Sequence, residues 1–104
     1  MALPPPSDHK ITLAEAVALT RRFRETATPK TERGGMFHRA PVDELLKQAG
    51  CAGLRFYQGR NADGSSAVVL VGVDEKGNDM TEGVILERQY PCPPFCGDPD
   101  GLNA

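Results

Sequence analysis

Seven consecutive residues, Ala67-Val-Val-Leu-Val-Gly-Val73, form the most apolar run of the chain, and four of them are β-branched. Side chains of this kind favour extended backbone, and a run without polar alternation is typical of a strand covered on both faces. The run therefore predicts the central strand of a sheet. The chain of 104 residues is long enough for one domain with a modest core.

The segments on either side of this run predict its neighbours in the sheet. Turn-forming residues flank it at Asn61–Gly64 and at Asp74–Asn78. Leu54–Gln58, before the first turn, alternate between apolar and polar side chains, and Val84–Gln89 form a further extended run after the second. Short turns connect antiparallel strands, so we expect an antiparallel meander of three to four strands.

The first half of the chain predicts two helices. Thr12 and Glu15 have the spacing of a capping box, and apolar residues repeat at helical intervals from there to Ala27, before Thr28-Pro29. A second, shorter helix is expected from Ala40-Pro41 to about Ala49. Helices followed by strands indicate an α+β fold, with both N-terminal helices packed on the sheet.

Two proline-rich segments flank the predicted domain. Residues 1–10 contain three consecutive prolines and polar residues, which indicates a disordered leader. Residues 91–104 form an irregular tail rich in proline and cysteine, because prolines exclude a helix there. The predicted organisation is thus a leader over 1–10, a single α+β domain over 11–90 and a tail over 91–104.

Cys92 and Cys96 lie four positions apart in the segment Pro91-Cys-Pro-Pro-Phe-Cys96. Stiff backbone between them suits three states: reduced thiols in a structural tail, a small disulfide loop, or half of a metal site. A disulfide here closes a loop of five residues, for which loop entropy gives only about 2 kcal/mol. The pair is therefore a candidate redox or metal site rather than a strong structural cross-link.

A zinc site needs four ligands, so the pair would need further donors. Cys51, between the second helix and the first strand, and His38, in the long connection before that helix, are the candidates. Zinc is thus the one cofactor that the sequence suggests. Cys51 also allows a fainter hypothesis, a small thiol enzyme in which it is the nucleophile, although a free cysteine beside a strand is more often a small buried apolar residue.

The tail also offers a candidate binding surface. Pro93, Pro94 and Phe95 present rigid apolar groups, and Arg33 and Arg39 carry positive charge in the preceding connection. The two arginines belong to a basic group with Arg21, Arg22, Arg24 and Lys30. Carboxylates dilute this group and no phosphate-binding glycine motif accompanies it, so solvated surface is the expected role.

Charge and hydropathy indicate which classes of partner the chain is expected to bind. A net charge of −2 disfavours nucleic acid, and no apolar run approaches the length of a membrane span. A sheet apolar on both faces needs a cover for its second face, either the tail through Phe95 or a second copy in a homodimer. The expected partner is therefore another protein or a second copy of the chain. The N-terminus lacks the pattern of a secretory signal, so we expect a cytoplasmic protein, in which cysteines are first expected as thiols or metal ligands.

Four segments carry a family resemblance: Gly50-Cys-Ala-Gly-Leu-Arg-Phe-Tyr57, Val69-Leu-Val-Gly-Val-Asp74, Gly77-Asn-Asp79 and Pro91-Cys-Pro-Pro-Phe-Cys96. Together they resemble a group of small uncharacterised bacterial proteins that end in a Cys-Pro-Pro-aromatic-Cys motif. The resemblance implies a bacterial origin and a shared fold, without a mechanism. The leading hypothesis is a non-enzymatic interaction module, and the alternative is a zinc-binding or redox-responsive protein that uses Cys92 and Cys96.

Overall fold

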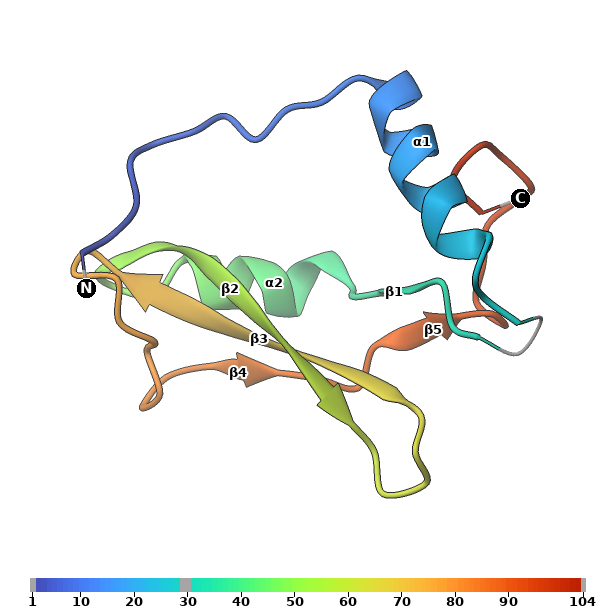
Figure 1. The fold of residues 1–104 in the computed structure, drawn as a ribbon. Helices are drawn as coiled ribbons and strands as arrows, with labels where there is room; N and C mark the ends of the chain where they lie inside the picture. Colours follow the sequence, from blue (N-terminus) through green and yellow to red (C-terminus); the bar gives the residue numbers. More distant parts are fainter. Residues whose placement is uncertain (1, 29–30, 104) are drawn as a thin grey trace. The chain divides into compact units, whose positions relative to one another are not determined.

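The apolar run forms the central strand of a sheet, as predicted. In the computed structural model, which describes residues 2–28 and 31–103, strand β3 (Ser66–Asp74) lies between β2 (Cys51–Arg60) and β4 (Ile85–Leu86) in a three-stranded antiparallel sheet (Figure 1). Leu70 and Val71 are adjacent and so point to opposite faces, and both are buried. Both faces of β3 are therefore covered at its centre.

The chain divides into two units, each built from separate segments. The sheet unit comprises Met1–Pro6 and Phe37–Gln89, and the tail unit comprises Ser7–Met36 and Tyr90–Ala104. Helices and antiparallel sheets occur in separate stretches, so the fold class is α+β. The predicted division into a leader, a single domain and a tail stays a prediction. Pro29 and Lys30, named in the sequence predictions, lie outside the described residues.

In the sheet unit, helix α2 (Arg39–Leu46) packs on the three-stranded sheet. Its Leu45 is completely buried. Gln48, just after the helix, joins it to the segment before β4: its Nε2 donates to the Leu45 carbonyl oxygen at 2.8 Å, and its Oε1 accepts the Val84 N–H at 2.8 Å. A Cβ atom at Gly72 of β3 would lie only 3.0 Å from that Nε2, so the glycine makes room for the contact.

In the tail unit, helix α1 (Leu13–Arg24) begins with the predicted capping box. The Thr12 hydroxyl accepts the Glu15 N–H at 3.1 Å, and the Glu15 carboxylate accepts the Thr12 N–H at 3.3 Å. The helix ends at Arg24, three residues before the predicted end. A two-stranded antiparallel sheet of β1 (Gly34–Met36) and β5 (Tyr90–Cys92) completes the unit and was not predicted.

The details of the predicted sandwich are not confirmed. Of the two helices, α2 belongs to the same unit as the three-stranded sheet, whereas α1 belongs to the tail unit. An amphipathic stripe shows that one helix face prefers apolar surroundings, but it does not identify the element that provides them. The third strand is also shorter than predicted: β4 covers Ile85–Leu86 of the expected Val84–Gln89.

Candidate functional site

The tail motif starts from a strand that is held by β1. Gly34 faces Cys92, Gly35 faces Pro91 and Met36 faces Tyr90 in the antiparallel register. The Arg33 N–H donates to the Cys92 carbonyl oxygen at 2.6 Å and extends this pairing by one residue. Proline is accepted in β5 because a two-stranded sheet has only edge strands. Cys92 thus stands at the end of a hydrogen-bonded strand.

From this strand end, Cys92 forms a disulfide with Cys96, and their Cα atoms are 4.7 Å apart. Within the loop, the Phe95 N–H donates to the Pro91 carbonyl oxygen at 2.8 Å, and the peptide bonds before Pro93 and Pro94 are cis. The structure therefore has the disulfide among the three states considered above. The expectation that the cysteines of this pair are thiols or metal ligands is not met, because each sulfur is bonded to the other.

Aromatic side chains gather at this loop. The rings of Tyr90 and Phe95 meet edge to face, with centroids 5.0 Å apart and an interplanar angle of 61°. Met36 faces Tyr90 across the ribbon, so the two side chains lie on one face. The exposed fractions are 46% for Met36, 46% for Tyr90 and 58% for Phe95. We call these three residues the aromatic tip.

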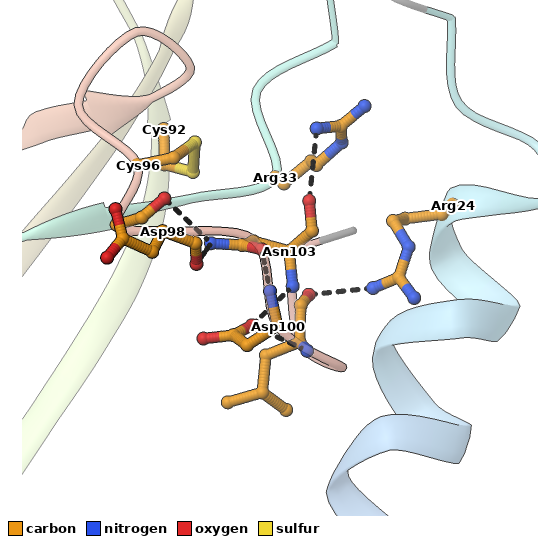
Figure 2. The surroundings of a disulfide bond; sticks show 9 residues. Arg24, Arg33, Cys92, Cys96, Asp98, Asp100 and Asn103 are labelled. Atoms are coloured by element: carbon orange, nitrogen blue, oxygen red, sulfur yellow. Dashed lines mark hydrogen bonds between the residues drawn. A yellow bond between two sulfur atoms is a disulfide. The ribbon is translucent and has the colours of Figure 1, made fainter.

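The segment after the disulfide folds into a capped turn that two arginines hold (Figure 2). The Asp100 carboxylate accepts the N–H groups of Leu102 and Asn103 at 2.8 and 3.0 Å. Arg24 of α1 donates to the Leu102 carbonyl oxygen at 2.7 Å, and Arg33 donates to the Asn103 carbonyl oxygen at 3.4 Å. Arg33, predicted as part of a binding surface, therefore also has a structural role.

A hollow of about 170 Å³ adjoins this turn within the tail unit. Its lining residues come from α1, from the segment before β1 and from the capped turn: Leu19, Thr20, Phe23, Arg24, Arg33 and Leu102. The walls are mostly apolar, and the arginines bordering the hollow are those that hold the turn.

The other predicted site residues belong to the sheet unit. Cys51 opens β2, and its thiol donates to the Gly53 carbonyl oxygen at 3.2 Å. His38 is the N-cap residue of α2, where its side chain makes no capping hydrogen bond. Arg39 forms an ion pair with Asp43 at 3.4 Å on the same helix. Residues 2–28 and 31–103 hold no group of three or more His, Cys, Asp or Glu side chains that could bind a metal.

Sequence reasoning missed one polar cluster, which lies on the sheet unit. The Asp79 carboxylate accepts a hydrogen bond from Tyr57 Oη at 2.5 Å and one from Arg55 at 2.5 Å. The Tyr57 hydrogen bond and then Arg55 lower the pKa of Asp79, whereas the hydrogen bond to Asp79 raises the pKa of both partners. The signal in the sequence was the i, i+2 spacing of Arg55 and Tyr57, which places both on one face of a strand.

Comparison with known proteins adds no identity. No protein-family model, no curated protein and no solved structure matches the chain. Within the described ranges 2–28 and 31–103, no helix has the length and apolar character needed to cross a membrane.

Proposed function

We propose that the chain is a non-enzymatic interaction module that binds a protein partner through the aromatic tip. One observation carries the proposal: Tyr90 and Phe95 form an exposed aromatic pair on a loop that is closed covalently between Cys92 and Cys96. Aromatic residues and methionine are enriched at protein interfaces, and the tip consists of these residue types.

The loop supports the proposal because it limits the freedom that the tip would lose on binding. Side chains that are ordered only on binding lower affinity by about 0.5–1.5 kcal/mol each. The disulfide, the Phe95 N–H bond to Pro91 and the prolines at 93 and 94 restrict the backbone around Phe95 before any partner arrives. A preorganised tip can therefore convert more of its contact area into affinity.

The first experiment identifies the partner through the tip itself. A photoreactive phenylalanine analogue placed at position 95 should crosslink one protein, and the same analogue at position 23 serves as a control in the tail unit. Phe23 has an exposed fraction of 50%, similar to the 58% of Phe95, and it borders the hollow instead of the tip. Equal crosslinking from both positions would contradict a binding surface at the tip.

Affinity measured with the purified partner then tests the energetics. Phe95→Ala should weaken binding by about tenfold or more, as the loss of an interface hot spot does. Phe23→Ala, with a similar loss of exposed aromatic surface, should leave the affinity within about threefold. An unchanged dissociation constant for Phe95→Ala would refute the proposal.

The disulfide favours a second candidate function, a redox-responsive form of the same module. An external dithiol would reduce the Cys92–Cys96 bond to two thiols and would itself become a disulfide. The loop would lose its covalent closure, and Tyr90 and Phe95 would lie on a more mobile backbone. We expect the reduced protein and the Cys92→Ser/Cys96→Ser variant to bind the partner more weakly than the oxidised protein, and to equal degrees. Equal affinity of the oxidised and reduced proteins would exclude this candidate.

The zinc alternative has a separate test. If the zinc alternative is correct, native mass spectrometry of the reduced protein, purified without a metal-affinity tag, should show bound zinc. The Cys92→Ser/Cys96→Ser variant should then show none. A metal-free mass of the reduced parent would remove the alternative.

A further inference from the structure

Strand β2 forms one edge of the three-stranded sheet along its whole length. The strand order β2-β3-β4 leaves β2, with ten residues, at one edge and β4, with two residues, at the other. Short edge strands are a common protection against pairing with another chain, and β4 has that protection. β2 does not, since it is long and free of proline, and its one irregularity lies at its start, between Cys51 and Gly53.

Hydrogen bonds at both sides of β3 identify the groups that face the open edge. Beyond the end of β2, the Asn61 N–H donates to the Ser65 carbonyl oxygen at 2.8 Å, which makes these two a hydrogen-bonded pair. Such pairs alternate with non-hydrogen-bonded pairs along an antiparallel ladder. In the observed register, the backbone groups of Gly59, Tyr57 and Arg55 therefore form hydrogen bonds with β3. The outward N–H and C=O groups belong to Leu54, Phe56 and Gln58.

A contact on the far side of β3 supports this assignment. The Met80 N–H donates to the Gly72 carbonyl oxygen at 2.8 Å, so Gly72 directs its carbonyl away from β2. Gly72 faces Leu54 in the register, which makes this pair non-hydrogen-bonded and turns the groups of Leu54 outward. No backbone hydrogen bond in the described part of the chain other than those to β3 involves residues 54–60.

We propose that two copies of the chain pair antiparallel through this edge, about a two-fold axis at Phe56. Residues whose numbers add to 112 would then face each other, and the two three-stranded sheets would become one of six strands. The outward groups of Phe56 would bond to those of the partner's Phe56, and Leu54 would bond to the partner's Gln58.

The sequence of β2 favours a second copy in this register. Arg55 faces the partner's Tyr57, and Arg60 faces the partner's Ala52, so no two like charges meet. An axis at Arg55 would place two arginines opposite each other. An axis at Tyr57 would pair residues 54–60 alone, whereas the axis at Phe56 pairs residues 52–60. Phe56 is 58% exposed, and pairing would bring two such rings together at the axis.

A charge-reversal experiment tests both the dimer and its axis. In the parent, light scattering after gel filtration at about 0.1 mM protein should give the mass of a dimer. Phe56→Lys and Phe56→Glu should each be monomeric, because like charges would meet at the axis, and an equimolar mixture of the two should return to a dimer. Circular dichroism confirms that each variant is folded. A monomeric parent, or a mixture that stays monomeric, overturns the proposal.

Disulfide trapping determines the register of the two β2 strands with variants that carry no added charge. In a Cys51→Ser background, Phe56→Cys should form a covalent dimer about tenfold faster than Leu54→Cys, because only a residue on the axis faces itself. Faster trapping of Tyr57→Cys than of Phe56→Cys would refute the axis. The test of the dimer is independent of the test of the aromatic tip. Phe95→Ala changes the tip but not strand β2, so the protein can fail to bind a partner through the tip and still form this dimer.

Discussion

Leu45 of α2 offers the sharpest test of how the sheet unit is held together. Its side chain is completely buried, whereas the next residue of the same helix, Leu46, is 42% exposed. The substitutions Leu45→Ala and Leu46→Ala remove the same atoms and change helix propensity by the same amount. The difference between their effects on the free energy of unfolding therefore reports burial alone.

The magnitude follows from the atoms removed. Leucine to alanine deletes three carbon atoms, each worth about 0.8 kcal/mol when fully buried, or about 2.4 kcal/mol in total. The cavity left beneath α2 adds to this, so Leu45→Ala should cost about 3–4 kcal/mol. Leu46 is 58% buried by the same measure, which gives about 1.4 kcal/mol and little cavity. The expected difference between the two variants is about 2 kcal/mol.

Urea unfolding monitored by circular dichroism at the α-helical band measures both variants. A chain of this size has a total stability of about 5–15 kcal/mol, so a loss of this size shifts the midpoint clearly. Equal free energies of unfolding for Leu45→Ala and Leu46→Ala would refute the conclusion that α2 is anchored to the sheet through Leu45. A larger loss for Leu46→Ala would place the buried face of the helix one residue further on.

Three further predictions concern single contacts. Gly101→Ala should lower the thermal unfolding midpoint, because its Cβ would lie 2.8 Å from a side-chain carbon of α1, whereas Gly97→Ala, with nothing within 4 Å, should leave the midpoint unchanged. Gln48→Ala should cost about 1–3 kcal/mol in urea unfolding, since a half-buried N–H loses its acceptor; an effect below about 0.5 kcal/mol would contradict that role. Asp79 has a lowered pKa, so its contribution to stability is complete above its unfolded-state pKa and is lost as the pH falls through its folded-state pKa. The parent should therefore be more stable than Asp79→Asn at pH 7, and urea unfolding should show the difference shrinking towards about pH 2; a difference independent of pH would contradict the ion pair with Arg55.

Local patterns predicted the elements whose signals lie within a few residues. The capping box at Thr12 is an interaction between neighbours, and the structure contains it. The Ala67–Val73 run likewise predicted the central strand, because continuous apolar side chains can be satisfied only between two covered faces. The turns at Asn61 and at Asp74 were readable for the same reason, since their hydrogen bonds close within five residues.

Elements that depend on distant partners could not be read in this way. β1 contains two glycines in a segment that resembles a loop, and it is a strand because Tyr90–Cys92 pairs with it from the far end of the sequence. The position of α1 in the tail unit was hidden for a related reason: an amphipathic stripe does not specify its partner.

The candidate site shows the same limit. The spacing of Cys92 and Cys96 is compatible with thiols, a disulfide or metal ligation, and the expectation about compartment favoured the wrong state. The edge-to-face pair of Tyr90 and Phe95 was also unforeseen, because a five-residue turn brings the rings together. Phe95 was predicted as part of a binding surface in the tail, and this role stays a prediction.

The two-segment construction of the tail unit has a consequence for the order in which the protein matures. β1 has no strand to pair with until Tyr90–Cys92 has been synthesised, whereas the elements α2, β2, β3 and β4 are contiguous along the chain. The three-stranded sheet can therefore form from one contiguous stretch of the chain, whereas the aromatic tip forms only when two segments far apart in the sequence meet. A chain that stops before Tyr90 would retain every strand of the three-stranded sheet and lack the β1–β5 ribbon, so the two sheets depend on different parts of the sequence.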